Sequence, residues 1–363
     1  MKTFSQTLIE WYEAHRRDLP WRGISDPYRV WISEVILQQT RVSQGYDYYC
    51  RFVEHFPDVA SLAAAPADEV MRYWQGLGYY SRARNLHRAA RSMAGGTFPT
   101  TYEGVRALPG VGPYTAAAIC SLAYSMPMAV VDGNVYRVLA RYLGIDVPID
   151  STQGRKLFMQ IAQELLDPAR PALHNQAMMD LGATICTPRR PLCADCPLAT
   201  SCLALAEGRE AQLPVKQQRT ALRHRYLNYI VVRMGDDSLL LRRRNENDIW
   251  QGLYELPLVE ADHELSIEQL LCHPRFEQFS RGLMTTVSSP HEPSDVGHPL
   301  PALRPIVQGV KHVLTHRILH VNFYELCPGD DFIPPEGFLR VTFDNLAGYA
   351  MPALLTAFLE KYL

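Results

Sequence analysis

The architecture of the first half of the chain follows from one octapeptide, Leu108-Pro109-Gly110-Val111-Gly112-Pro113-Tyr114-Thr115. Gly110 and Gly112 permit a tight turn and a close approach of the backbone to another molecule. Pro113 has the fixed φ angle that is preferred at the first position of a helix. The octapeptide therefore predicts a turn that presents backbone N–H groups at a helix N-terminus, where phosphate can bind without charged side chains. A plain turn between two helices is the structural alternative for Gly-x-Gly taken alone.

Helical periodicity surrounds this turn over roughly the first 200 residues. The segments with this pattern are predicted to be amphipathic helices: Phe4–His15, Tyr28–Gln44, Ala67–Trp74, Ser81–Ala94, Tyr114–Tyr124 and Asn134–Leu143.

The pattern changes after a polar, basic stretch over residues 208–225, which is typical of an interdomain linker. Beyond it, segments that alternate or run apolar at strand length begin at Tyr226, Ser238 and Lys311. Asp248–Ser266 is predicted to be a loop that enters a helix, and Ser288–Pro305 a long loop. We therefore expect an all-helical domain over residues 1–207 and a mixed α and β domain over residues 226–363.

Composition places the chain among globular proteins. It has 363 residues, of which 47% are hydrophobic and 20% charged, so it can bury a sizeable core in two domains. It contains no apolar run of about 18 residues and no secretory signal, so we expect a cytoplasmic protein without a membrane span. The formal net charge of −2, taken alone, argues against a nucleic-acid partner.

Four of the eight cysteines form one cluster with spacings of six, two and five residues: Cys186, Cys193, Cys196 and Cys202. Four thiolates at such spacings converge on one metal ion or one iron-sulfur cluster more readily than they form disulfides in a chain without an export signal. The spacing alone leaves zinc and a 4Fe-4S cluster both open. The four scattered cysteines are expected to be small buried hydrophobic residues.

Three features in order resemble the helix-hairpin-helix superfamily of base-excision DNA glycosylases. They are the octapeptide, the apolar run Met128–Val131 followed by Asp132-Gly133-Asn134, and the cysteine cluster that closes the domain. The resemblance implies an all-α helix-hairpin-helix glycosylase domain, with the four cysteines holding a 4Fe-4S cluster. It also implies double-stranded DNA as the partner, in a nucleoid-associated monomer.

Two positions separate the chemistries within this superfamily. Members that cut the strand through a Schiff base carry a lysine where this chain has Tyr114, and the lysines before the linker are Lys2 and Lys156 alone. Tyrosine is shared by thymine-mismatch enzymes and by MutY-type adenine glycosylases. The segments that resemble the adenine enzymes are Leu19–Arg22, Pro27–Arg41, Gly76–His87 and Asn175–Ala183.

The resemblance assigns the chemistry to two carboxyl groups. Glu34 has Val30 and Leu37 on its own helix face, so its pKa should be raised, as a general acid requires. By resemblance Glu34 protonates adenine, most readily at N7, and Asp132 stabilises the cationic sugar that is left. Tyr114 is expected to hydrogen-bond near Asp132. Helix capping is the structural alternative for Asp132, and Asn134 is expected to take that role while Asp132 faces the substrate.

The same resemblance assigns the DNA contacts. Trp21 and Arg22 are expected to line the base pocket, and Gly110 and Gly112 to bind phosphate. Gln39 and Tyr79 match the residues that family members insert into the helix when the base is flipped out. A core position is the structural alternative for Tyr79, since adjacent aromatic residues commonly pack inside.

Ile249–Pro257 resembles an element of Nudix-like domains, but the residues after it lack the spacing of a nucleotide-hydrolysing Nudix box. In MutY-type enzymes this α+β domain senses 8-oxoguanine through a His-x-x-Ser-His loop. The matching residues here are His312, Thr315 and His316, with threonine in place of serine.

The sequence therefore predicts a monofunctional glycosylase that removes adenine mispaired with 8-oxoguanine or guanine. A thymine-mismatch glycosylase is one alternative. A lesion-binding iron-sulfur protein without catalysis is the other, and intact Glu34 and Asp132 argue against it.

Overall fold

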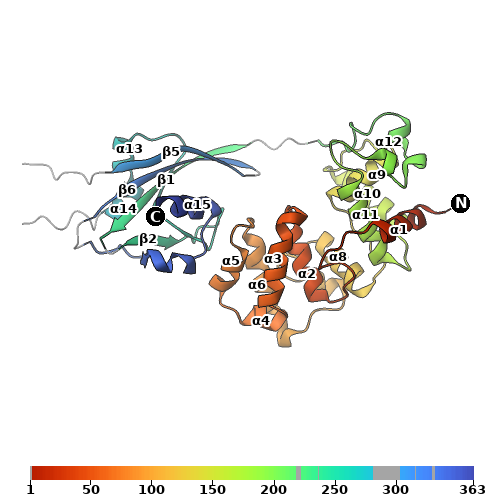
Figure 1. Ribbon diagram of the computed structural model, residues 1–363, viewed down its shortest axis with the longest axis horizontal. Coiled ribbons are helices and arrows are strands. Elements are labelled where there is room, and N and C mark those ends of the chain that lie inside the picture. The colour runs from red at the N-terminus through yellow and green to blue at the C-terminus, as the bar shows by residue number, and fades with distance from the viewer. Residues whose placement is uncertain (1, 218–221, 236, 281–302, 315, 329–331) are drawn as a thin grey trace, which may run out of the picture. The chain divides into compact units, whose positions relative to one another are not determined.

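The computed structural model describes residues 2–217, 222–235, 237–280, 303–314, 316–328 and 332–363 (Figure 1). The chain divides into two compact units. The first comprises Met1–Tyr73 and Arg82–Arg219, and the second Trp74–Ser81 and Thr220–Leu363. The second unit's sheet begins at Arg223, inside the stretch that was expected to be a linker. Among the described residues, we find no helix with the length and apolar character that crossing a membrane requires.

The segment before the second unit's sheet is helical throughout, which confirms the predicted all-α class. Its α-helices are α1 (Phe4–His15), α2 (Pro27–Leu37), α3 (Val42–His55), α4 (Val59–Ala64), α5 (Ala67–Trp74), α6 (Ser81–Ser92), α7 (Tyr102–Arg106), α8 (Pro113–Tyr124), α9 (Gly133–Tyr142), α10 (Thr152–Leu165), α11 (Pro171–Thr184) and α12 (Leu203–Ala206). The 3₁₀ turns are η1 (Ala94–Gly96), η2 (Cys193–Asp195) and η3 (Ala199–Ser201).

Local sequence explains where several of these helices begin. Asp26 accepts hydrogen bonds from the first amides of α2, and Pro27 stands at its first position. Pro113 begins α8 as predicted, directly after Gly112. Strong caps and N-terminal prolines thus fix the starts of the helices that carry the predicted site.

The prediction of one helix over Tyr28–Gln44 is wrong. The chain leaves α2 at Gln38 and resumes at Val42, because Gln39 has a φ of 55°, which an α-helix cannot contain. Arg82 of α6 supplies the hydrogen bonds that a continuing helix would have made. Its Nη1 donates to the carbonyl oxygens of Val35, Ile36 and Gln38 at 2.8, 3.0 and 2.6 Å.

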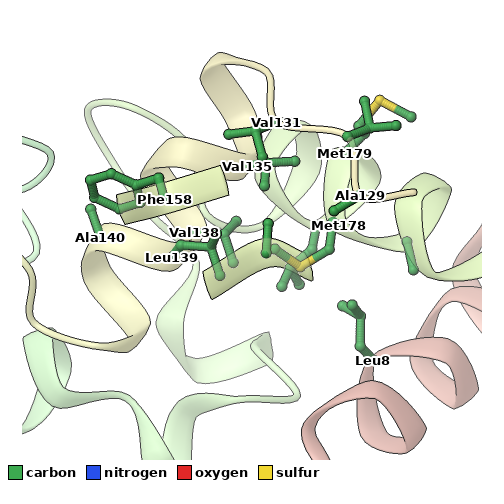
Figure 2. Packing of buried hydrophobic residues seen from close by; sticks show 14 of the residues in the cluster. Leu8, Ala129, Val131, Val135, Val138, Leu139, Ala140, Phe158, Met178 and Met179 are labelled. Carbon is green, nitrogen blue, oxygen red and sulfur yellow. The ribbon is translucent and has the colours of Figure 1, made fainter. Parts of the chain in front are cut away.

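One apolar cluster holds α9 against α11 (Figure 2). Val135, Val138 and Leu139 of α9 pack with Met178 of α11 and Phe158 of α10, and all five are buried. Truncating a fully buried leucine such as Leu139 to alanine costs about 2–5 kcal/mol in such a core. The cluster therefore fixes the start of α9, where Asp132 lies, relative to α11.

The second unit is a mixed sheet with helices on both faces, which confirms the predicted α+β class. Its strands are β1 (Arg223–Met234), β2 (Ser238–Arg243), β3 (Tyr254–Glu255), β4 (Leu258–Ala261), β5 (Arg304–Val313), β6 (Arg317–Leu326) and β7 (Phe338–Thr342). Its helical elements are α13 (Ile267–Leu271), α14 (Pro274–Ser280), η5 (Phe343–Gly348) and α15 (Ala353–Tyr362).

The strands run in the order β3-β2-β1-β6-β5, with β4 paired to β1 and β7 to β2. β1 lies parallel to β6, and the other pairs are antiparallel. Alternate residues of β1 enter two separate cores. Tyr229 packs in the cluster that includes α15, and Ile230 in the cluster that includes α13 and α14.

Two predictions in this unit need correction. Asp248–Ser266 is not a loop that enters a helix, because it contains β3 and β4, and Leu256 and Leu258 are buried in the sheet core. The helix begins later, at Ile267, where Ser266 caps it. The apolar run that begins at Lys311 belongs to two antiparallel strands, since β5 ends at Val313 and β6 begins at Arg317. Most of the loop predicted over 288–305 lies outside the described residues.

Candidate active site

A cavity of about 550 Å³ opens among the helices of the first unit. Its wall comes from α2, α8, the start of α9, α11, the segment before α2 and the segment between α2 and the start of α3. It brings together the four predicted catalytic residues and three of the predicted DNA contacts: Glu34, Tyr114, Asp132, Asn134, Trp21, Arg22 and Gln39. These residues are scattered along more than a hundred positions, so the helix packing assembles the site.

Glu34 projects from the middle of α2 into this cavity. The Tyr114 hydroxyl donates a hydrogen bond to its Oε2 at 3.0 Å. Burial raises the pKa of Glu34 to about 7, and the nearby charge of Asp132 adds to the rise. The Tyr114 hydrogen bond and the positive charge of Arg22 act in the opposite direction. The rise predicted from the neighbours of Glu34 is thus found, and this carboxyl group can hold a proton near neutral pH.

Tyr114 stands in the first turn of α8, immediately after Pro113. Its pKa lies well above the ordinary value for tyrosine, chiefly because it is buried and then because Glu34 and Asp132 are near. The phenol therefore stays protonated and serves as a hydrogen-bond donor. Besides Glu34, it lies 3.8 Å from Sδ of Met179 on α11.

Asp132 is itself the cap of α9, so the expectation that Asn134 caps this helix is wrong. Asp132 Oδ1 accepts from the backbone N–H groups of Asn134 and Val135 at 2.9 and 2.8 Å. A side chain reaches the amides two and three positions ahead, and Asn134 is already inside the helix. The Asn134 side chain instead donates from Nδ2 to Asp132 Oδ2 at 2.8 Å, and its Oδ1 accepts from Arg137.

The pKa of Asp132 is raised by burial, while these three hydrogen bonds act to lower it. The carboxyl group is fixed on both oxygens by neighbours within three residues. Asn134 thus orients Asp132 at the cavity wall.

Gln39 and Tyr79 share an uncommon backbone conformation. Their φ angles are 55° and 49°, in the left-handed region that costs a non-glycine residue free energy. Gln39 is exposed, and Tyr79 is 42% exposed whereas its neighbour Tyr80 is buried. The core position considered for Tyr79 belongs to Tyr80 instead. Backbone strain at a residue with an exposed side chain commonly marks a functional position.

The octapeptide forms the turn between α7 and α8. Gly110 has a φ of 79°, and a Cβ atom there would lie 2.6 Å from Cβ of Asn85. Gly112 has an ordinary φ of −83° and open space around its Cα. Gly110 is therefore required by the turn itself, whereas Gly112 leaves the surface bare at the start of α8.

The four clustered cysteines line a cavity of about 30 Å³ in the first unit. Burial raises the pKa of the Cys196 thiol to about 11, and the charges of the other three thiols contribute to the rise. Arg141 of α9 donates to the carbonyl oxygen of Thr187 at 2.7 Å and lies 3.3 Å from Sγ of Cys186. Among the described residues, no group of three or more His, Cys, Asp or Glu side chains is placed to hold a metal ion. The thiols gather without reaching the geometry of a single-ion site.

Two of the three predicted lesion contacts, His312 and His316, lie at the hairpin between β5 and β6. His312 is half-buried at the end of β5, where burial lowers its pKa, and its ring lies 6.4 Å from that of Trp250. His316 is exposed in the turn, and Thr315 lies outside the described residues.

Glu255, in the segment that resembles a Nudix element, is fully buried and paired with arginines. It accepts from Arg242 and Arg244 at 2.7 and 2.8 Å. This carboxylate therefore stabilises the sheet and is occupied by protein donors.

Sequence reasoning missed Arg17, Met179 and Asp180. Arg17 and Met179 line the large cavity. Asp180 is 1% exposed and accepts from both Arg17 and Arg22. One signal was present in the sequence, because Asp180 stands between apolar residues of a helix that is buried almost all around.

Comparison with known proteins gives two family matches. Residues 32–168 match the HhH-GPD superfamily of base excision DNA repair proteins, and residues 228–361 match the NUDIX domain.

Two similar relatives and one solved structure extend these matches. An adenine DNA glycosylase of Buchnera aphidicola subsp. Baizongia pistaciae is 30% identical over 351 residues, which cover 86% of this chain and 98% of the relative. The mouse adenine DNA glycosylase is 44% identical over 237 residues, or 62% of this chain, but this chain spans 46% of the mouse protein's length. A thermostable thymine-DNA glycosylase of known structure is 30% identical with a TM-score of 0.52, and the match covers 56% of this chain and 95% of that one.

Proposed function

The chain belongs to the family of adenine DNA glycosylases, and from this premise we propose that it hydrolyses the N-glycosidic bond of adenine paired with 8-oxoguanine or guanine in double-stranded DNA. The observation that carries the proposal is the hydrogen bond from Tyr114 to Glu34 in the cavity that also holds Asp132. The cavity therefore contains one carboxyl group that can be protonated, that of Glu34, and a second one, that of Asp132. It is large enough for a base.

Glu34 acts as the general acid. Adenine is a poor leaving group as an anion, so its bond to deoxyribose breaks at neutral pH when the base is protonated, most readily at N7. With a pKa of about 7, Glu34 is half protonated near neutral pH and can give the proton up. Tyr114 engages Oε2, so the proton is carried on Oε1.

Asp132 stabilises the sugar that loses its base. Departure of adenine leaves an oxocarbenium-like ring that a nearby carboxylate stabilises electrostatically. Three local hydrogen bonds hold the Asp132 carboxyl group still, which keeps it oriented before the charge develops. Water then adds to the anomeric carbon and gives a proton to the Glu34 carboxylate, which restores the acid. The strand that carried adenine keeps an abasic site.

The remaining predicted residues bring the base into the cavity and recognise the DNA around it. Adenine must leave the duplex stack, and Gln39 and Tyr79 fill the space that it vacates. Trp21 and Arg22 contact the base inside the cavity. The amides at Gly110 and Gly112 hold a phosphate next to the flipped nucleotide. His312, Thr315 and His316 read the 8-oxoguanine partner, and the protein acts as a monomer.

The four clustered cysteines hold a 4Fe-4S cluster. Their spacing of six, two and five residues suits either a zinc ion or a 4Fe-4S cluster. The resemblance to base-excision DNA glycosylases favours the cluster, and the four thiols line one shared cavity. When bound, the cluster supplies a cross-link that orders the loop from Cys186 to Cys202 beside α9.

Thymine release is the second candidate, because a thymine-DNA glycosylase is 30% identical over 56% of this chain. The match covers 95% of that enzyme's length but only 56% of this chain. The adenine relative from Buchnera extends over 86% of the chain, which gives the second unit a counterpart as well.

One assay separates these candidates. Labelled duplexes with adenine opposite 8-oxoguanine, adenine opposite guanine and thymine opposite guanine are incubated with the protein and then treated with alkali or with borohydride. We expect alkali-dependent cleavage of the adenine strands alone, and loss of this cleavage in Glu34→Gln. Cleavage of the thymine strand would favour the second candidate. A covalent complex trapped by borohydride would contradict a mechanism without a lysine.

A further inference from the structure

Asp180 of α11 is a buried carboxylate that binds two arginines through one oxygen. Its Oδ1 accepts from Nη2 of Arg17 at 2.5 Å and from Nη2 of Arg22 at 2.7 Å. The Asp180 side chain is 2% exposed, and those of Arg17 and Arg22 are 30% and 12% exposed. Arg17 and Arg22 belong to the segment between α1 and α2, far from α11 in sequence. The contact is therefore a tertiary one.

The charges of Asp180, Arg17 and Arg22 depend on each other. A buried carboxylate is costly without a partner, and two guanidinium groups that share one acceptor atom repel each other. Among the described atoms, Asp180 Oδ2 and the Nε atoms of both arginines are buried without a hydrogen-bond partner. The Asp180 charge is thus the feature that keeps Arg17 and Arg22 together.

The two arginines face the candidate active site, and Asp180 does not. Arg17 and Arg22 line the cavity of Glu34, as do Met179 and Ala183 on either side of Asp180 in α11. Asp180 is absent from that wall. The carboxylate therefore supports the arginines from outside the cavity.

We propose that Asp180 is a positioning residue for the reaction: its carboxylate holds Arg17 and Arg22 on the cavity wall, so that a fixed positive charge faces Glu34 and the flipped base. This inference rests on the proposed function. It adds a role for a residue that touches neither the base nor the sugar.

Removing the charge of Asp180 should raise the pKa of Glu34. The titratable or charged groups that share the cavity with Glu34 are Tyr114, Asp132, Tyr136, Arg17 and Arg22. Of these, Arg22 and the Tyr114 hydrogen bond lower the pKa of Glu34, and Asp132 raises it. Without Asp180, repulsion drives the two guanidinium groups apart and toward water. The pKa of Glu34 then rises, because the positive charge that favoured its ionised form has moved away.

Two measurements on the whole 363-residue chain test this inference. The first is the single-turnover rate of adenine release against pH, which falls as Glu34 loses its proton. The second is the ¹³C NMR titration of the Glu34 carboxyl in the free protein, assigned by its absence in Glu34→Gln. We expect Asp180→Asn to move both midpoints upward by about 1 pH unit. Asp167→Asn is the matched control, because Asp167 pairs with Arg170 at an exposed site.

A double-mutant cycle separates positioning from a general loss of structure. If Asp180 acts through Arg22, then Arg22→Gln moves the midpoint upward, and adding Asp180→Asn moves it little further. An unchanged midpoint in Asp180→Asn, or shifts that add in the double variant, would overturn the inference. If Asp180→Asn does not fold, Asp180→Ser removes the same charge in less space, with the same expected shift.

The NMR titration also distinguishes the two proposals. If the wild-type protein releases no adenine, the proposed function fails, whereas the Glu34 midpoint still reports on Asp180. If the wild type is active but Asp180→Asn titrates like the wild type, the positioning role alone fails.

Discussion

The hydroxyl group of Tyr114 and the carboxyl group of Glu34 act as one unit in this molecule. Burial pushes the Glu34 pKa upward, and the hydrogen bond from Tyr114 restrains it at about 7. A phenol donor favours the ionised carboxylate, so this contact, together with the charge of Arg22, offsets part of the rise in pKa that burial causes. Phe at position 114 would keep the shape and remove the donor.

We therefore expect Tyr114→Phe to raise the pKa of Glu34 above about 7. The protonated form is the active acid, so the rate falls as pH rises through this pKa. In the variant the fall should begin at higher pH, and the rate at low pH should change less. Single-turnover adenine release from pH 5 to pH 9 or so measures the midpoint. Tyr136→Phe is the control, because Tyr136 lines the same cavity and belongs to α9. An unchanged midpoint would show that Tyr114 does not act on Glu34, and a lower one would contradict the expected sign of its effect.

Resemblance to known motifs predicted residues that local spacing could not. Glu34, Tyr114 and Asp132 fall in one cavity, as the motifs required. Arg17 and Asp180 escaped prediction because they are 163 positions apart and meet only through the packing of α11. Their ion pair has no local pattern, so the sequence shows an isolated buried acid and nothing of its partners.

The break between α2 and α3 shows what periodicity alone misses. The four residues after Leu37 are polar, but none of them is glycine or proline, so no local breaker marks the end of α2. The end is imposed by Arg82, which donates to the last carbonyl oxygens of α2 from a different helix. Such a stop signal is tertiary. By contrast, Pro113 and Asp26 act within their own segments, and the helix starts that they mark were predictable.

At the helix-hairpin-helix turn we expect Gly110→Ala to destabilise the protein by about 1–3 kcal/mol. Its positive φ disfavours alanine, and the added methyl group would lie 2.6 Å from Cβ of Asn85. Urea unfolding monitored by far-UV circular dichroism gives the free energy of unfolding.

Gly112→Ala is the matched control for this substitution, since its φ is −83° and the added methyl group meets no atom within 4 Å. Its free energy of unfolding should stay within roughly 0.5 kcal/mol of the wild type. Equal losses of unfolding free energy in the two variants would mean that the positive φ and the close contact at Gly110 are not what makes glycine necessary there.

Across the whole molecule, the two-part architecture was predictable and the strand pairing was not. Helical periodicity in the first half and strand-length apolar runs in the second are local patterns. The parallel pairing of β1 with β6 joins residues about ninety positions apart, from Arg223 with Arg317 to Val232 with Leu326. Short strands such as β3, with two residues, carry no alternation to detect. Net charge was equally uninformative, because the phosphate contact that we propose uses backbone amides, which carry no net charge.

We expect the two units to divide the work between them, so that a substitution in the second changes lesion preference and spares catalysis. His316→Ala should reduce the rate advantage of adenine opposite 8-oxoguanine over adenine opposite guanine by about tenfold, the effect of losing one hydrogen bond to a base. The rate with guanine as the partner should be unchanged. Parallel single-turnover assays on the two duplexes measure this ratio.

His263→Ala is the control, because His263 is likewise exposed and lies outside the hairpin of β5 and β6. A loss of rate on both duplexes in His316→Ala would indicate damage to the fold rather than to recognition.

The capping role of Asp132 affects the choice of an inactive variant for a complex with uncleaved DNA. Asp132→Asn would set an amide against Nδ2 of Asn134, or against the backbone amides at the start of α9, and one set of hydrogen bonds would be lost. In a structure of that variant bound to a duplex, the start of α9 would be frayed next to the substrate. Within the described part of the chain, Glu34 accepts one hydrogen bond, from Tyr114, and glutamine can accept it equally well. Glu34→Gln is therefore the better choice for crystallising the bound, uncleaved substrate.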